Sequence, residues 1–400
     1  MDSAILKLRI TGAAGVYRVL AEVAGKQGSD NLAALPPTLR ESLAPLQEAM
    51  LRTTDSLRDR GQMRGRPPNA PPAIPAAPAV RGVNFVSGSD DKDIRHIGTQ
   101  LFDCVFQRNV WTLYKDALEA AHAKKAELQI KLCVEAPELS YIPWETMFDE
   151  TRLFHLSCSP VTPFARVASM EELDLHIYDR LPLRILCMVS APNVFIGTPY
   201  ELRTDVEQAA LDHALEPLKR ANQVELCWTA SGTLRELKTR ILRGDQGEQW
   251  DVFMFIGHGL EGRVVLEEDG GPGYELIPAE PLRGFLEGAN GPKLVILNSC
   301  KGAKRREDRL ASTAEVLVRS PKIAAVVAMQ FDISDIMGAK FSPTFFSNLM
   351  LGVPIQQAMT LTRLELQAAG FTEWISPVLY MQSKDGRVLK DAGPAAARGT

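Results

Sequence analysis

Apolar and amphipathic segments alternate over the second half of the chain. Six short runs are almost continuously apolar, which is typical of strands buried on both faces of a sheet. The expected strands are Leu183–Val189, Val224–Thr229, Val252–Gly257, Leu294–Asn298, Ile323–Ala328 and Val378–Met381. The expected amphipathic helices lie at about 201–220, 233–243, 280–287, 310–319, 336–351 and 354–369. This alternation predicts an α/β fold with a doubly wound, mainly parallel six-stranded sheet and helices on both faces. Between Gly262 and Gly273 we expect a short hairpin rather than a helix.

The first half of the chain has a different pattern. Ile5–Ile10 and Val16–Val23 alternate around two glycines and predict a β-hairpin, and residues 39–57 carry leucines at helical spacing. Residues 64–82 contain six prolines and little that could pack, so we expect an extended linker or surface loop there. Asp90–Ala126 then reads as two helices, and Leu128–Val134 as a strand.

These patterns predict how the chain is divided. We expect a smaller N-terminal α+β region of a hairpin and a helix, followed by the linker. A helical and strand subregion then packs on the sheet-forming core, and a flexible tail ends the chain. The corresponding ranges are 1–63, 64–82, 83–180, 181–385 and 386–400.

Overall composition and charge disfavour several function classes, although they leave a local binding patch open. The 400 residues are 45% hydrophobic and 24% charged, as in a globular protein with an ample core. The net charge of −4 and a pI near 6.0 do not favour nucleic acid or an anionic membrane as a direct partner. No apolar run is long enough to span a membrane, and the N-terminus lacks a signal-peptide pattern, so we expect a cytoplasmic protein.

The six cysteines are scattered and form no CxxC pair or Cys/His cluster at zinc-binding spacing. The sequence therefore indicates no metal site and no cofactor, and it favours a reducing compartment. Five of the cysteines are expected to be ordinary buried thiols: Cys104, Cys133, Cys158, Cys187 and Cys227.

The sixth, Cys300, follows an expected strand, and His258 follows another. The first strand ends in Gly257-His258-Gly259 and the second in Asn298-Ser299-Cys300. Catalytic groups of parallel sheets sit at the carboxyl ends of the strands. If the two strands are neighbours, an imidazole and a thiol meet at one edge, as a cysteine nucleophile with a histidine base requires.

The surroundings of Cys300 favour a reactive thiol. The chain changes there from an apolar strand to a polar turn, so we expect the thiol to be exposed. Four nearby basic residues would favour the thiolate, although a solvated surface loop explains them equally well; they are Lys301, Lys304, Arg305 and Arg306. The backbone amides of Gly259 and Cys300 would supply an oxyanion hole.

Several ordered segments of the chain resemble the CHAT domain family, a bacterial branch of the caspase-like cysteine peptidases that includes relatives of separase. Ile142-Pro-Trp-Glu-Thr-Met-Phe-Asp149 is similar to the family's Leu-Pro-Trp-Glu-Leu segment. Pro182–Pro192 resembles its first core strand, and Phe255–Gly259 and Val295–Cys300 its histidine and cysteine signatures. Val326–Asp335 and Trp374–Tyr380 resemble its closing strands. The resemblance covers most of the chain. We interpret Trp144 and Trp374 as packing residues.

The resemblance implies a cysteine endopeptidase in which His258 is the general base and Cys300 the nucleophile that forms a thioester with a protein substrate. It also implies that Asp332 and Asp335 line a substrate pocket, which would suit Arg or Lys before the cut. An equal alternative is that Asp335 caps the helix starting near Ile336. The resemblance further implies control by a regulatory protein partner or sensor, and a role in bacterial antiviral defence or programmed cell death.

Two other classes of function remain open at this point. The first is a catalytically silent adaptor that binds partners through the edge of the sheet, against which the retention of both His258 and Cys300 argues. The second is a Cys/His transferase, because a thioester can pass its acyl group to an amine as well as to water.

Overall fold

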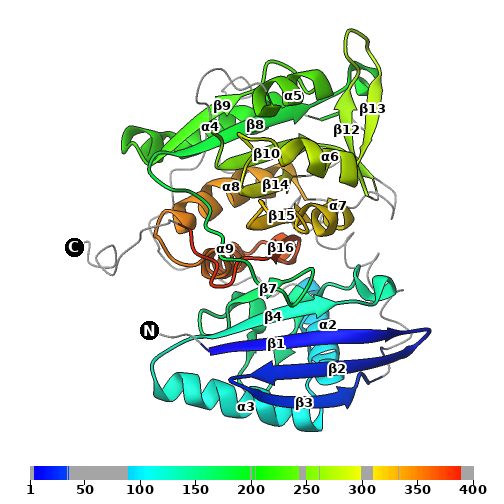
Figure 1. Cartoon of the computed structure of the whole chain (residues 1–400), viewed down its shortest axis with the longest axis vertical. Helices are drawn as coiled ribbons and strands as arrows, with labels where there is room; N and C mark the ends of the chain where they lie inside the picture. The colour runs from blue at the N-terminus through cyan, green and yellow to red at the C-terminus, as the bar shows by residue number, and fades with distance from the viewer. Residues whose placement is uncertain are drawn as a thin grey trace.

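A single mixed sheet of eleven strands runs through the protein, flanked by helices (Figure 1). The computed structural model describes residues 4–33, 35, 89–198, 201–202, 204–242, 249–260, 262–298, 310–331 and 333–388. The helix expected at 39–57 and the proline-rich segment 64–82 lie outside these residues. The order of the strands is β3-β2-β1-β4-β7-β16-β15-β14-β10-β8-β9.

The six strands expected in the second half of the chain are confirmed. They are β8 (Leu183–Ser190), β9 (Val224–Trp228), β10 (Val252–Gly257), β14 (Leu294–Asn298), β15 (Ala325–Met329) and β16 (Pro377–Met381). All neighbouring pairs among them are parallel except β15 and β16, which are antiparallel. Because helices cover both faces, every residue of β10, β14 and β15 is buried, which explains their continuous apolar runs.

The six expected helices pack on opposite faces of these strands. They are α4 (Thr204–Arg220), α5 (Leu234–Leu242), α6 (Ala279–Leu286), α7 (Leu310–Leu317), α8 (Asp335–Leu349) and α9 (Ile355–Ala368). Helices α4, α8 and α9 share one core with Met254 and Ile296, whereas α5, α6 and α7 share a second core with Phe253 and Val295. Successive residues of a strand point to opposite faces, so these two cores confirm a sheet covered on both sides.

The sheet does not stop at six strands. The first half of the chain contributes five more strands and two helices. They are β1 (Ala4–Ala13), β2 (Val16–Val23), β3 (Lys26–Asn31), β4 (Leu128–Val134) and β7 (Phe164–Arg166), together with α2 (Ser89–Val105) and α3 (Arg108–Ala123). The expected hairpin of β1 and β2 is confirmed, and β1 also pairs in parallel with β4. The pairing of Arg166 with Tyr380 joins β7 to β16 and makes one sheet of the two halves. Figure 1 shows the blue N-terminal strands at one end and the green β8 and β9 at the other.

A smaller antiparallel sheet follows β10. It consists of β11 (Gly259–Leu260), β12 (Arg263–Glu267) and β13 (Tyr274–Pro278), and it confirms the hairpin expected between Gly262 and Gly273. The remaining short elements are η1 (Pro137–Leu139), η2 (Trp144–Thr146), β5 (Phe148–Asp149), β6 (Phe154–His155), η3 (Leu156–Cys158), η4 (Asn193–Phe195) and η6 (Thr372–Ile375).

The start of the expected C-terminal tail is packed against the fold. The side chain of Val388 is only 2% exposed, and its carbonyl oxygen accepts hydrogen bonds from the backbone N–H groups of Ile177 and Tyr178 at 3.0 and 2.9 Å. Residues 386–388 therefore belong to the folded part of the chain, and residues 389–400 lie outside the described ranges.

Candidate active site

Strands β10 and β14 are adjacent and parallel, as the proposed meeting of imidazole and thiol requires. Their register pairs Val252 with Leu294 and continues to the pair Ile256 and Asn298. Strand β10 ends at Gly257, and His258 is the next residue. His258 therefore sits at the carboxyl edge of the sheet, beside the end of the strand that leads to Cys300.

The partners predicted for His258 are described only in part. Cys300 and Asp332 lie outside the described residues, as do the basic residues that follow Cys300. Gly259, whose amide is the other predicted oxyanion donor, begins β11. Asp335 is the first residue of α8, and its side chain is not described. The dyad, the oxyanion hole and the acidic pocket therefore stay predictions.

The alternative role considered for Asp335, capping of its helix, is wrong by one residue. Ser334 occupies the N-cap position of α8, where its hydroxyl oxygen accepts a hydrogen bond from the backbone N–H of Met337 at 3.1 Å. Serine and aspartate are both favoured at N-caps, so the sequence alone could not decide between them. The Glu373 carboxylate fixes this choice, because it accepts from the Ser334 backbone N–H at 2.6 Å and from its hydroxyl at 3.2 Å.

The ring of His258 is largely buried, with 6% of the residue exposed. It meets the ring of Phe195 edge to face, with centroids 5.3 Å apart and an interplanar angle of 87°. Aromatic rings favour this geometry because the positive edge of one ring faces the negative face of the other. The carbonyl oxygen of His258 accepts a hydrogen bond from the backbone N–H of Val265 at 3.0 Å. The loop after β8 thus contacts the ring of His258, and β12 binds its backbone.

Glu267, the last residue of β12, binds two loops at this edge of the sheet. Its Oε1 accepts from the backbone N–H of Ala191 at 3.1 Å, and its Oε2 from that of Gly232 at 2.9 Å. At Gly232 a Cβ atom would lie 2.4 Å from the carbonyl oxygen of Val189, so the close approach requires glycine. We did not single out Phe195 or Glu267 from the sequence, because each acts on segments distant along the chain.

A buried ion pair lies where the two halves of the sheet meet. Arg166, on β7, donates to both carboxylate oxygens of Glu145 at 2.9 and 2.5 Å, and both residues are at most 2% exposed. Gln330, which follows β15, donates to the same carboxylate at 3.0 Å and accepts from Arg166 at 3.1 Å. Glu145 follows Trp144 in the segment Ile142–Asp149, which carries part of the family resemblance. A charged residue among apolar neighbours is a sequence signal for a buried ion pair, but it does not indicate the partner.

The two tryptophans interpreted as packing residues are buried, with 0% of Trp144 and 1% of Trp374 exposed. The indole N–H of Trp144 donates to the carbonyl oxygen of Leu139 at 3.1 Å. The ring of Trp374 lies 4.8 Å from that of His155. Both side chains therefore contribute to the core, as expected.

Four of the five other cysteines are buried and the fifth, Cys227, is half-buried. Burial raises the pKa of Cys104 and Cys133 to about 11 and that of Cys158 to about 12, because the thiolate loses its hydration. Burial also raises the pKa of Cys187 well above its usual value. These four thiols are poor nucleophiles near neutral pH, in agreement with the expectation that they are structural.

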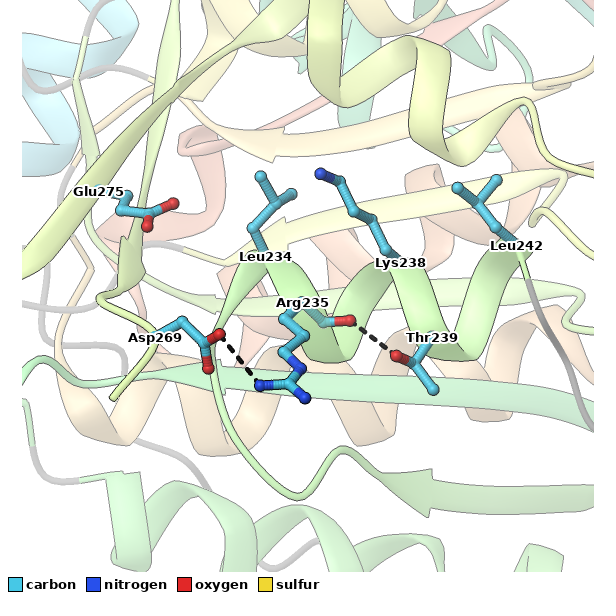
Figure 2. Close-up of a pocket in the computed structure, with 7 residues that line it drawn as sticks. All are labelled: Leu234, Arg235, Lys238, Thr239, Leu242, Asp269 and Glu275. Atoms are coloured by element: carbon cyan, nitrogen blue, oxygen red, sulfur yellow. Dashed lines mark hydrogen bonds and ion pairs between the residues drawn. The ribbon is translucent and has the colours of Figure 1, made fainter. Parts of the chain in front are cut away.

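A cleft of about 610 Å³ lies between α5 and the β12–β13 hairpin (Figure 2). Arg235 of α5 reaches across it, with Nη1 3.3 Å from Oδ2 of Asp269 in the hairpin turn. Figure 2 shows Leu234, Lys238 and Leu242 on another side of the same helix. Among the described residues that line this cleft, none comes directly after β10 or β14, so we do not assign the cleft to the candidate active site.

No group of three or more potential metal ligands occurs among the side chains that the structure describes. Within the same residues, no helix is long and apolar enough to cross a membrane.

The fold and the strand ends define an α/β protein with a histidine at the carboxyl edge of a parallel sheet. The chain belongs to the CHAT domain family, because the model of that family matches residues 96–373. This agrees with the resemblance seen in the sequence and assigns the chain to a family of caspase-like proteases. The match includes both β10 and β14, and it begins within α2 and ends in η6.

Solved structures similar to this chain include separase in two crystal structures of the Saccharomyces cerevisiae separase–securin complex, at 2.6 and 3.0 Å resolution. In each comparison the identity is 12% and the TM-score 0.48, and 94% of this chain is covered but only 30% of the separase chain. The chain thus spans less than a third of the separase polypeptide. A search of curated proteins found no match.

Proposed function

We propose that this protein is a cysteine endopeptidase in which His258 is the general base and Cys300 the nucleophile. The observation that carries the proposal is the register of β10 and β14. Ile256 pairs with Asn298, and His258 and Cys300 each follow two residues later. In-register neighbours on parallel strands lie about 5 Å apart, so a register continued by two residues brings imidazole and thiol within reach of each other.

The chemistry follows from these positions. His258 accepts the thiol proton, and the Cys300 sulfur attacks the carbonyl carbon of the scissile peptide bond. The backbone N–H groups of Gly259 and Cys300 stabilise the negative oxygen of the tetrahedral intermediate. As the C–N bond breaks, the imidazolium gives its proton to the leaving amine. Water activated by the same imidazole then hydrolyses the thioester.

The substrate in this proposal is a protein with Arg or Lys before the cut, recognised by the carboxylates of Asp332 and Asp335. Membership of a caspase-like protease family supports the reaction class. We further propose that a protein partner or sensor controls the enzyme, and that it acts in the bacterial cytoplasm as an effector of antiviral defence or programmed cell death. These roles rest on the family resemblance alone.

Thiol alkylation tests the dyad without a known substrate. A histidine-paired cysteine stays ionised well below the usual thiol pKa, so we expect iodoacetamide to modify Cys300 with a midpoint below about pH 7. In His258→Ala the midpoint should rise to about 8.5. Peptide mass spectrometry identifies the modified residue, and Cys227→Ala serves as the matched control because Cys227 is the half-buried thiol. Equal midpoints in wild type and His258→Ala would refute the pairing.

Proteolysis itself is tested with cells or lysates in which new protein N-termini are mapped by mass spectrometry. We expect cleavage after Arg or Lys with the wild type and with Cys227→Ala, but not with Cys300→Ala. The same cleavages with Cys300→Ala would remove the peptidase proposal in favour of the adaptor. Products whose new C-terminus is joined to an amine, instead of being the free carboxylate that hydrolysis leaves, would indicate a transferase.

A further inference from the structure

Three exposed apolar side chains gather at the edge of the sheet near His258. Val194 and Ile196, in the loop after β8, are 50% and 65% exposed, and Tyr274, at the start of β13, is 48% exposed. Single exposed apolar residues are common on protein surfaces, but adjacent ones mark binding sites. Together with Phe195 between them in the chain, we call these residues the apolar wall.

The apolar wall is in direct contact with the candidate base. The Phe195 ring lies edge to face against His258 with centroids 5.3 Å apart, and it stacks on Tyr274 at 5.4 Å with an interplanar angle of 27°. Phe195 therefore contacts both the imidazole and the tyrosine. A group bound on the wall where Phe195 meets His258 would lie next to the imidazole.

The backbone that carries the wall is held in place from several sides. The N–H of Val194 donates to the carbonyl oxygen of Pro272 in the β12–β13 hairpin at 2.9 Å. Glu267 accepts from Ala191, just before the wall. The exposed side chains are thus presented by a loop and a hairpin tied to each other, which reduces the entropy lost when a ligand binds.

The order of the strands indicates on which side of the scissile bond the apolar wall lies. In the sheet, β15, β14, β10 and β8 follow one another, so the wall beside β8 and the end of β15 lie on opposite sides of His258 and the end of β14. In the proposed function, the residue before the cut lies on the Asp332 side. The leaving amine must lie near His258, because this imidazole protonates it. The residue that carries this amine is therefore adjacent to the wall.

We infer that the apolar wall is the binding site for the residue immediately after the scissile bond, and that it selects a large apolar or aromatic side chain there. This inference rests on the proposed function and extends it to the other side of the cut. The neighbouring hairpin also carries Glu268, whose Oε2 accepts from the backbone N–H of Gly273 at 3.1 Å, just before Tyr274. Its charge disfavours an acidic residue in the same position by like-charge repulsion.

The test compares two kinds of substrate that share a library of residues before the cut. The first has Leu, Phe, Ser or Asp fixed after the cut, and the second replaces everything after the cut with a methyl ester, which leaves the wall empty. Leu and Phe should raise kcat/KM about fivefold to tenfold over Ser, because one side of the side chain leaves water. Tyr274→Ser and Ile196→Ser should bring kcat/KM for the Leu and Phe substrates down to that for Ser, and they should lower methyl ester hydrolysis no more than they lower cleavage of the Ser substrate. Leu351→Ser is the matched control, because Leu351 is 59% exposed in a distant turn after α8.

A binding measurement keeps this inference separate from turnover. Fluorescence anisotropy with Cys300→Ala and uncut peptides should show the same order, Leu and Phe above Ser and Asp, and the order should be lost in the double variant with Tyr274→Ser. Equal affinities for all four peptides, or a preference that survives both substitutions, would overturn the inference. Absence of any Cys300-dependent hydrolysis while the anisotropy order persists would instead overturn the proposed function.

Discussion

Asp251 lies at the opposite end of β10 from His258, and its ionisation is linked to stability. It precedes Val252, and its Oδ2 accepts from the backbone N–H of Arg184 on β8 at 2.8 Å. Burial raises the pKa of the Asp251 carboxyl to about 6, although the Arg184 hydrogen bond and the Lys293 charge act in the opposite direction. The folded protein therefore holds the proton more tightly than the unfolded chain.

The sign of the pH dependence follows from this difference. Below its usual pKa of 3.8 the carboxyl is protonated in both states and has no effect on folding. As the pH rises from 3.8 to the folded-state pKa of about 6, the carboxyl ionises in the unfolded chain but stays protonated in the folded protein, so stability is lost over this range and the loss is complete above it. The loss amounts to about 1 kcal/mol near pH 4.5 and at most about 3 kcal/mol near pH 7.5.

Asp251→Asn removes the charge and keeps an oxygen for the Arg184 N–H. We expect its free energy of unfolding to exceed that of the wild type by about 3 kcal/mol near pH 7.5 and by about 1 kcal/mol near pH 4.5. Urea unfolding at several pH values, followed by tryptophan fluorescence, measures the difference between the two proteins, in which other titrations cancel. Asp251→Ala is the control: it shares the pH dependence but lacks the hydrogen bond, which costs about 1 to 3 kcal/mol at every pH. A difference that is independent of pH, or an Asn variant less stable near neutral pH, would refute the reasoning.

Two further predictions concern the packing of the Trp144 segment and the helices around it. Glu145→Gln should lower the free energy of unfolding by about 3 to 5 kcal/mol, because it leaves the buried Arg166 guanidinium without a carboxylate; a loss below about 1 kcal/mol in urea titrations would contradict the pair's importance. Gly98→Ala in α2 should cost about 2 kcal/mol or more, because its Cβ atom would meet the Thr146 carbonyl oxygen at 2.0 Å. Gly284→Ala in α6 is the control: a Cβ atom there meets nothing within 4 Å, so the free energy of unfolding should rise by about 0.5 to 1 kcal/mol. Equal melting temperatures for the two glycine variants would show that the close approach of Gly98 to Thr146 does not cause a loss of stability.

The C-terminal half of the fold could be predicted from the sequence because its signals are local. Val252–Gly257 and Leu294–Asn298 are strands with the predicted bounds, since continuous apolar runs of this length between helices have few other interpretations. The hairpin after His258 was also predicted, from glycines and alternating residues. In such cases the type and order of the elements can be predicted, and they leave few possible arrangements of adjacent strands in a doubly wound sheet.

The joining of the two halves could not be predicted, because it depends on pairings between distant segments. Strand β7 has only three residues, and Arg166 among them would read as a surface charge. Its burial becomes favourable only when Glu145 and Gln330 converge on it in space. For similar reasons the sequence indicated His258 but not Phe195, whose contact with the imidazole requires the loop after β8 to fold back over the end of β10.

The place of β16 in the sheet has a consequence for how the protein folds as it is synthesised. This strand follows all other strands of the sheet in the chain, yet it lies in the interior, between β7 and β15. Until residues 377–381 have emerged from the ribosome, both flanking strands present unpaired edges. Between the synthesis of β15 and that of β16, the nascent chain therefore carries two separate half-sheets, and insertion of a single late strand closes the gap between them. During that interval, chaperones that shield exposed strand edges would protect it from aggregation.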